Sequence, residues 1–499
     1  MSDITTDSST RPTEPLHENG YVLVSALFLK LLALIYFIAF ASLSGQIVGL
    51  AGADGIQPLH ILFENATHAY GAQRFLIYPT LFWLDASDTA LKAATWLGCA
   101  FSVTLFINYR PRLSLVLLFA LYLSLFHAGQ IFMNFQWDYL LMEAGFLAIF
   151  LRPDSRIMVF LFRWLLFRLR FLSGLSKIVS GDPAWTGLTA LTFYFETQPL
   201  PHIGAWYAHH LPVWLLMVGA AATLFIELVV PFLMFTTRRL RFIAAWLTIG
   251  LQLLILLTSN HNWFNLLSLT LCLFLFDDRA LARVLPRGLV GLLHGQQQTG
   301  AMSPVYKSAT TLLAAGVLII SGSQIWEMAS GTHIGGEAGH IRSYIEQWNI
   351  VNKYHVFPTI EQRRVELIIE GTRDGIHWKP YRFRYKPGAL DKPLKFIVPH
   401  HPRLDWMMWF VPLNPIFLPW FEDFLYALLD NAPTVTAMLE QNPFPDAPPK
   451  AIRVQAYLYQ FTTPEEHEAT GNWWKREYLG PFAPLPFVSN EPATAYRDQ

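Results

Sequence analysis

The chain has 499 residues, of which 53% are hydrophobic and only 14% are charged, and its mean hydropathy is +0.32. This composition lies well to the apolar side of ordinary soluble proteins and excludes a single water-soluble domain. Thirty-six basic side chains balance thirty-six acidic ones, so the chain has no overall field that would attract nucleic acid, and we expect no nucleic-acid partner.

Residues 1–20 are rich in Ser, Thr, Pro and acidic side chains and lack the basic region of a signal peptide. They predict a disordered tail. Residues 21–328 carry about nine apolar stretches, each close to the roughly 20 residues that a helix needs to cross a bilayer. The sequence therefore predicts a helical, multi-pass membrane domain. The stretches lie near 22–44, 90–108, 113–128, 139–151, 156–176, 212–235, 240–258, 263–276 and 308–326.

Basic residues fall in every second connection between these stretches, which indicates that those connections and the amino terminus are cytoplasmic. With an odd number of spans, everything after the last one then lies on the other side of the membrane. We expect a bacterial inner membrane with a periplasmic C-terminal domain, or the endoplasmic reticulum membrane with a lumenal one. The basic residues are Arg110, Arg112, Arg152, Arg156, Arg238, Arg239, Arg241, Arg279, Arg283, Arg287 and Lys307.

Residues 329–499 have the composition of a water-soluble domain of ordinary size. Two runs of alternating apolar residues, 365–369 and 381–385, flank the turn residues Asp374 and Gly375 and predict a β-hairpin. A further alternating run at 453–461 follows a segment at 420–440 with helical spacing. The sequence predicts a β-rich domain, either a β-sandwich or an α+β unit.

Catalytic signatures are missing from the chain. It has no GxSxG, HExxH, GxGxxG, P-loop or CxxC motif, so a hydrolase, a zinc enzyme or a nucleotide enzyme has no motif to support it. Its two cysteines, Cys99 and Cys272, both lie in apolar stretches, which leaves no thiol in the polar parts for a disulfide or a zinc site. We expect neither a cofactor nor a metal ion.

Ionisable residues inside apolar stretches are costly, and they mark paired or functional positions. Glu227 lies deep in the sixth stretch and needs a partner, for which Arg163 and Arg170 are candidates. Lys177 lies at the outer end of the fifth stretch, either as an interfacial cation or as a base. Asp182 follows it, before a proline, and predicts the start of a helix that runs to about residue 194.

A polar cluster is predicted at the outer ends of the spans. Within it, Asp138 and Glu143 are five residues apart, so on one helix their carboxylates point apart and cannot form a general acid/base pair by themselves. A structural role is the simpler interpretation of both, and catalysis is the alternative. The other members of the cluster are His127, Asn134, Asp182, Asn260 and Asn265.

Long runs of the sequence resemble the lipase maturation factor family. They include SGLSKIVSGDPAWTGLTALTFYFETQPLPHIGAWYAHHLP, TSNHNWFNLLSLTLCLFLFDD, RRVELIIEGTRDGIHWKPYRFRYKPG and NPFPDAPPKAIRVQAYLYQFT, and they come from both the apolar and the soluble part. The resemblance implies a multi-pass membrane protein, resident in the endoplasmic reticulum in animals, that helps secreted lipases reach their folded, active form. The short amino terminus and the scarcity of cysteine indicate a bacterial-type member. Membrane lipid and secreted clients, including lipases, are the implied partners.

In this family the soluble C-terminal part is tied to lipase maturation, so we expect the client-binding residues there. Aromatic and arginine side chains are the usual anchors of protein interfaces, and packing of the same side chains in the core is the alternative. The candidates are Trp378, Tyr381, Arg403, Asp405, Trp406, Trp409, Trp473 and Trp474.

A shorter run, FLSGLSKIVSGDPAW, resembles a stretch of the vitamin K-dependent γ-glutamyl carboxylases. This second resemblance implies that Lys177 is a catalytic base. The competing hypothesis is therefore an integral membrane enzyme that acts on a lipid, a quinone or a peptide. It predicts a polar cavity lined by Lys177, Asp138, Glu143, Glu227 and Asn265.

Overall fold

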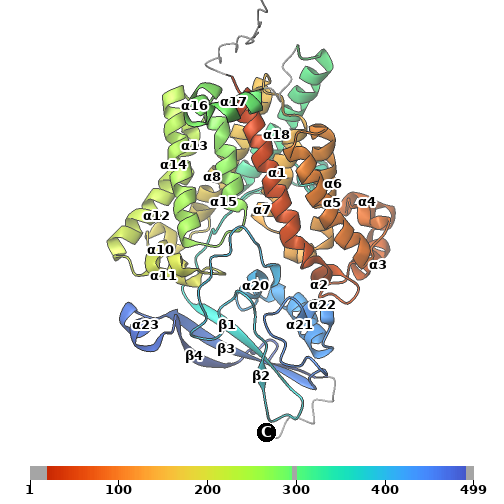
Figure 1. The fold of residues 1–499 in the computed structure, drawn as a ribbon, viewed down its shortest axis with the longest axis vertical. Helices are drawn as coiled ribbons and strands as arrows, with labels where there is room; N and C mark the ends of the chain where they lie inside the picture. The colour runs from red at the N-terminus through yellow and green to blue at the C-terminus, as the bar shows by residue number, and fades with distance from the viewer. Residues whose placement is uncertain (1–19, 295–300, 490–499) are drawn as a thin grey trace, which may run out of the picture.

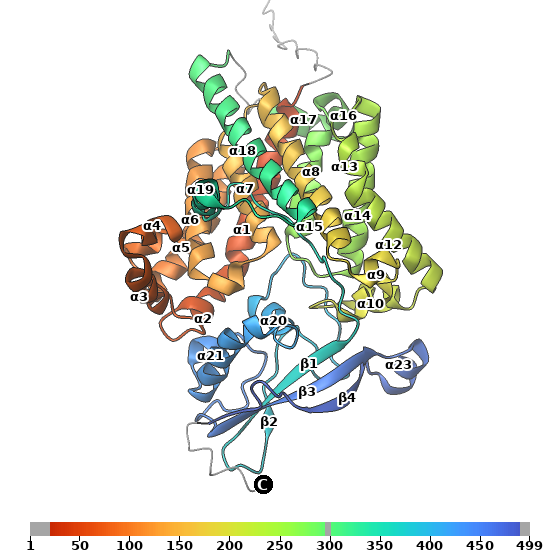
Figure 2. The same ribbon diagram turned by 180° about the vertical axis from the view of Figure 1, so that it is seen from behind.

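The computed structural model describes residues 20–294 and 301–489. The tail predicted at residues 1–20 lies outside these ranges except for its last residue. Long helices pack side by side in one half of the molecule, and a five-stranded sheet with short helices forms the other half (Figures 1 and 2). We call residues 361–489 the C-terminal module and residues 347–360 the linking segment.

A helix covers each of the nine apolar stretches. Five of them, α1, α5, α6, α14 and α18, are long and apolar enough to cross a membrane, or six if α11 (Ile203–His209) and α12 count as one span bent by 113°. The protein is thus a multi-pass membrane protein, and the full count of nine spans stays a prediction. The helices are α1 (Val22–Ser44), α5 (Asp88–Phe106), α6 (Pro111–Ala128), α7 (Gln136–Ile149), α8 (Arg156–Val179), α12 (Val213–Leu228), α14 (Arg238–Thr258), α15 (Phe264–Leu271) and α18 (Pro304–Ser330).

Shorter helices fill the connections between the long ones, and one more, α19, follows the last of them. They are α2 (Ile47–Ala51), α3 (Leu59–Tyr70), α4 (Arg74–Ile77), α9 (Pro183–Thr186), α10 (Ala190–Thr197), α13 (Val230–Leu233), α16 (Asp278–Val284), α17 (Arg287–His294) and α19 (Gly336–Glu346).

Local sequence explains several helix starts. Ser87 accepts the Ala90 N–H at the start of α5, and Ser155 accepts the Met158 N–H at the start of α8. Asp182 accepts the Ala184 N–H, as predicted. The helix expected from Pro183 to about residue 194 is nevertheless wrong: α9 ends at Thr186, Leu188 takes a left-handed φ of 59°, and α10 starts afresh at Ala190.

The C-terminal module is an α+β unit built on one antiparallel sheet in the order β2-β1-β3-β4, with β5 also paired to β3. The β-sandwich alternative is therefore wrong. Helices α20 and α21 lie between the sheet and the membrane helices (Figures 1 and 2). The elements are β1 (Arg364–Thr372), β2 (Lys379–Pro380), α20 (Arg403–Met408), α21 (Leu418–Leu429), α22 (Pro433–Thr436), β3 (Ala451–Phe461), α23 (Pro464–Thr470), β4 (Trp474–Pro481) and β5 (Phe487–Ser489).

The predicted hairpin exists, but its second strand is short. β1 pairs with β2 only through Glu370 with Pro380 and Gly371 with Lys379. The Tyr381 N–H still donates to the Ile369 carbonyl of β1 at 2.9 Å. The chain then leaves β1, and Arg382 bridges to Gln441 instead. The alternation of apolar residues could not predict this departure, because the segment around Gln441 that pairs with Arg382 lies far along the sequence.

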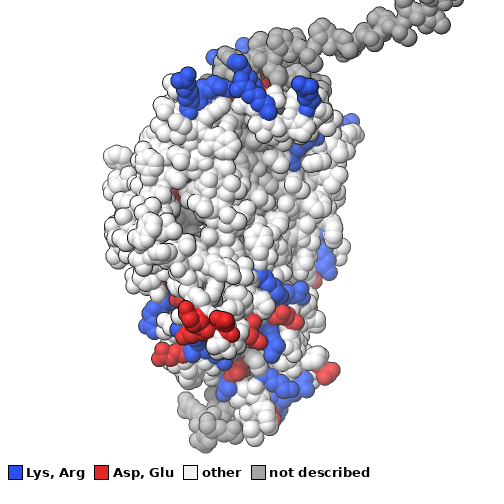
Figure 3. Space-filling model, turned by 60° about the vertical axis from the view of Figure 1, so that its left-hand side comes forward, with Lys and Arg blue, Asp and Glu red and all other residues white. Residues whose placement is uncertain are grey.

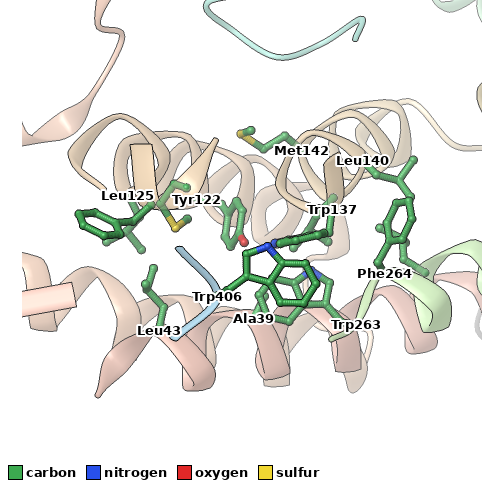
Figure 4. Close-up of a cluster of buried hydrophobic side chains, with 14 of the residues drawn as sticks. Ala39, Leu43, Tyr122, Leu125, Trp137, Leu140, Met142, Trp263, Phe264 and Trp406 are labelled. Atoms are coloured by element: carbon green, nitrogen blue, oxygen red, sulfur yellow. The ribbon is translucent and has the colours of Figure 1, made fainter. Parts of the chain in front are cut away.

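One buried core runs through both halves of the molecule. Figure 4 shows Trp406 of α20 beside Trp137 of α7, within a cluster that also includes Ala39, Leu140 and Trp263. The ring centroids of Trp137 and Trp406 are 5.1 Å apart in an edge-to-face arrangement, which is a favourable geometry for aromatic pairs. The module is thus packed onto the membrane helices through a shared core.

Charged side chains on the surface are distributed differently over the two halves of the molecule. Figure 3 shows basic side chains at the end far from the sheet, an almost uncharged belt, and mixed charges over the C-terminal module. A belt of this kind is what a hydrocarbon layer requires, since charged side chains facing lipid are costly.

Close packing of α7 against α1 depends on a glycine. A Cβ added at Gly145 would lie 1.9 Å from Oη of Tyr36, which is fully buried and donates to the Leu141 carbonyl at 3.1 Å. We expect Gly145→Ala to lower the free energy of unfolding by about 1–3 kcal/mol, the usual cost of overpacking. Thermal unfolding in detergent measures it.

Gly250 on α14 is the matched control, because a Cβ there would meet nothing within 4 Å. Gly250→Ala should leave stability unchanged or raise it slightly, since alanine has the higher helix propensity. Equal losses in the two variants would contradict the packing argument.

Candidate functional site

Asp138, at the start of α7, is bound by the C-terminal module. Arg403 of α20 donates to both carboxylate oxygens at 2.7 Å, and the Tyr122 hydroxyl donates to one of them at 2.6 Å. Arg403 also donates to the Phe132 carbonyl at 2.9 Å. All of these side chains are buried. A bidentate ion pair inside the core therefore joins the membrane helices to α20.

Glu143, further along α7, is bound by the linking segment. Its carboxylate pairs with Arg168 of α8, and it accepts the Asn352 backbone N–H at 3.0 Å and the Tyr354 hydroxyl at 2.8 Å. The two carboxylates of α7 thus point to different partners, in keeping with their five-residue spacing.

Lys177 is held by three acceptors. Its ammonium donates to Glu227 at 2.7 Å, to the Val356 carbonyl of the linking segment at 2.8 Å and to the Ser173 carbonyl at 3.3 Å. Of the partners predicted for Glu227, Arg170 lies 3.9 Å away, whereas Arg163 donates to the Phe274 carbonyl instead. Lys177 is the nearer partner of this carboxylate.

The cavity that the enzyme hypothesis predicted does not form as proposed. Lys177, Glu227 and Asn265 line one small cavity, but Asp138 and Glu143 are engaged elsewhere. An ammonium with three hydrogen-bond acceptors is also poorly placed to lose a proton and act as a base. The enzyme alternative therefore gains no support.

Most of the remaining polar cluster also holds C-terminal segments. Asp182 accepts the Ile360 N–H at 2.6 Å. Asn260 donates to the Lys395 carbonyl at 2.9 Å and accepts the Ile397 N–H at 3.0 Å. His127 lies 3.0 Å from the Gln347 carbonyl through Nε2. Asn134 and His127 line one pocket together, and Asn265 lines another.

Arg364 and Arg168 were missed by sequence reasoning. Arg364, at the start of β1, is buried and donates to the Glu196 and Pro199 carbonyls at 2.9 Å, which ties the sheet to the end of α10. Arg168 could have been found, because it is an ionisable residue within an apolar stretch. No local sequence pattern distinguished Arg364 from an ordinary charged residue at the start of a strand.

Five of the eight candidate client-binding residues are buried, which for them favours the alternative of core packing over an exposed client surface. Asp405, for example, accepts the Tyr385 and Lys386 N–H groups at 2.7 and 2.9 Å, and burial raises the pKa of this carboxyl. The buried residues are Tyr381, Arg403, Asp405, Trp406 and Trp474, and Trp378, Trp409 and Trp473 are half-buried.

A groove of about 470 Å³ opens where the membrane helices meet the module; we call it the junction groove. Trp409 lies in its wall with Nε1 donating to the Thr197 carbonyl at 2.7 Å, and Ile416 is 68% exposed. The wall is mainly aromatic and apolar. It is lined by Ile131, Asn134, Phe135, Gln136, Trp137, Pro199, His261, Phe264, His355, Val356, Phe357, Pro358, Thr359, Trp406, Met407, Trp409, Phe410, Ile416 and Phe417.

Comparison with known proteins gives matches over both halves of the chain. The family model of the lipase maturation factor transmembrane domain matches residues 23–283, and that of the lipase maturation factor C-terminal domain matches residues 350–484. No solved structure matches.

Curated relatives cover nearly the whole chain. Human lipase maturation factor 2 is 33% identical over 93% of this chain and 83% of its own length. Mouse lipase maturation factor 1 is 32% identical over 94% of this chain and 88% of its own length. Human lipase maturation factor 1 is 31% identical over 97% and 91%.

Proposed function

Because the chain belongs to the lipase maturation factor family, we propose that it is a membrane-embedded maturation factor that helps secreted lipases to fold and assemble. The observation that carries this proposal is the match of both the membrane part and the C-terminal module to that family. A protein of this kind needs an anchor and a client surface on the side of the membrane where secreted proteins fold. The two halves of the fold supply these two parts.

The distribution of charge supports the predicted orientation. The basic end of the molecule lies opposite the C-terminal module (Figure 3), and basic connections stay on the cytoplasmic side. The module then faces the periplasm if the chain resides in a bacterial inner membrane, or the lumen if it resides in the endoplasmic reticulum. Secreted lipases pass through either compartment.

The junction groove is the client surface that the structure favours. Rigid aromatic walls bind apolar segments at little cost in conformational entropy, and the hydrogen bond from Trp409 to Thr197 fixes one such wall. A folding client exposes the apolar segments that such a groove accepts. Trp378 and Trp473 lie outside the groove lining and stay secondary candidates.

Ile416→Asp tests this surface. A charge at the rim of an apolar groove should weaken client contact, and we expect the activity of a co-expressed secreted lipase to fall about tenfold, as loss of one interface anchor would produce. The assay uses cells that lack their own maturation factor, with the amount of the membrane protein measured in parallel.

Ile376→Asp is the matched control, because Ile376 is also 68% exposed but does not line the groove. It should leave lipase activity unchanged. The groove would lose its proposed role if both substitutions lowered activity equally, or if neither did.

A further inference from the structure

A small cavity lies within the membrane part, and its lining includes no residue of the C-terminal module. It has a volume of about 80 Å³ and lies between α8, α12, α14 and α15, beside the linking segment. The flank on which α12 and α14 lie (Figure 1) shows a hollow in its uncharged wall in Figure 3. Its lining includes the polar side chains of Arg170, Lys177, Glu227, Gln252 and Asn265.

The charges that line this cavity do not balance. Lys177 and Arg170 are cationic and Glu227 is the one acidic side chain among the lining residues, which leaves one excess positive charge. Lys177 is the closer partner of Glu227, at 2.7 Å against 3.9 Å for Arg170. A buried charge without a counter-ion is strongly disfavoured in a membrane. The lining therefore favours an anion next to Arg170.

Hydrogen-bond donors around the cavity also lack acceptors. Gln252 and Asn265 are each only 1% exposed. Among the described residues, neither amide atom of Gln252 has a partner, and the same holds for Nδ2 of Asn265 and Nε of Arg170. Buried polar groups are normally paired, and each unpaired one costs free energy. Three donors and one acceptor on residues that line the cavity thus lack a partner. This set suits a ligand that mainly accepts hydrogen bonds.

We propose that this cavity binds the carboxylate head of a single-chain amphiphile, a fatty-acid anion. A carboxylate offers several acceptor sites and the missing negative charge, and a head group of a few heavy atoms suits a cavity of about 80 Å³. The tail leaves between α12 and α14, past the apolar side chains of Leu251 and Ile255. Exposed apolar residues on both helices, such as Phe225 and Leu254, continue this path into the hydrocarbon layer.

Thermal unfolding of the full chain in detergent, titrated with oleate, tests the proposal. Oleate should raise the unfolding midpoint, because a ligand that binds only the folded state stabilises it. Methyl oleate lacks the charge and should bind at least tenfold more weakly, as expected for loss of charge-assisted hydrogen bonds. Lysophosphatidate, whose phosphate head is larger, should compete no better than methyl oleate.

Gln252→Leu should weaken oleate binding about tenfold and raise the unfolding midpoint without oleate, because it removes two unpaired groups. Thr248→Ala, one turn earlier on α14, is the control: Thr248 is buried, bonds to the Ala244 carbonyl and does not line the cavity. It should leave oleate binding unchanged.

Gln252→Glu keeps the shape of the side chain and supplies an internal anion, so it should abolish oleate binding even if Gln252→Leu fails to fold. Equal binding of oleate and methyl oleate, unchanged oleate binding in folded Gln252→Leu or Gln252→Glu, or tighter binding of lysophosphatidate would overturn the assignment. Lipase activity is not needed for any of these measurements, so they are independent of the proposed client surface.

Discussion

Arg403→Met is expected to lower the free energy of unfolding by about 3–5 kcal/mol, because removal of one partner leaves a buried charge uncompensated. Asp138 would then keep only the Tyr122 hydroxyl among its side-chain partners in the described structure. Since this pair joins α7 to α20, the C-terminal module should also detach more easily. Unfolding in detergent and limited proteolysis of the module measure the two effects.

The double variant Asp138→Leu with Arg403→Met separates lost pairing from lost packing. Replacing both charges with apolar groups is often nearly neutral, so the double variant should recover most of the stability lost in Arg403→Met. Arg453→Met is the control, because its pair with Glu370 is partly exposed and should contribute only about 0–1 kcal/mol. A double variant less stable than Arg403→Met would contradict the account.

Glu143→Leu should have a comparable effect, a loss of about 3–5 kcal/mol, because this carboxylate serves several buried partners at once. Arg168 would be left as an unpaired cation, and the Asn352 N–H and the Tyr354 hydroxyl would lose their acceptor. The linking segment should therefore become sensitive to protease before the sheet does. Mass spectrometry of the early fragments would locate the cuts.

Glu346→Leu is the matched control for this second variant. Glu346 pairs with Arg342 at 3.3 Å, but its side chain is 40% exposed, so we expect a change of at most about 1 kcal/mol and no new cleavage. Early cuts in the sheet instead of the linking segment in Glu143→Leu would show that Glu143 does not anchor this segment.

Three separate buried ion-pair clusters hold the later part of the chain: the one at Asp138 holds α20, and those at Glu143 and Lys177 hold the linking segment. In addition, Arg364 joins β1 to the end of α10. The module is therefore fixed in position against the membrane helices. A client that enters the junction groove would meet walls from both halves, so neither half alone should support maturation.

Sequence patterns predicted the local features well. Apolar stretches of membrane-spanning length became helices, Asp182 caps a helix, and the runs at 365–369 and 453–461 lie in β1 and β3. The same patterns failed where distant segments compete. The run at 381–385 does not continue as a strand beside β1, because Arg382 bridges to Gln441. Two tryptophans expected at a surface, Trp406 and Trp474, are buried in the core.

The amino-acid sequence by itself determined that this is a multi-pass membrane protein with a C-terminal domain that contains β-strands, because apolar length and periodicity act over neighbouring residues. Only the tertiary structure decided what the buried charges do. Arg403 lies 265 positions from Asp138, and Asn352 lies 209 positions from Glu143. Pairing at such separations depends on how the whole chain packs, so no local pattern could distinguish a docking contact from a catalytic group.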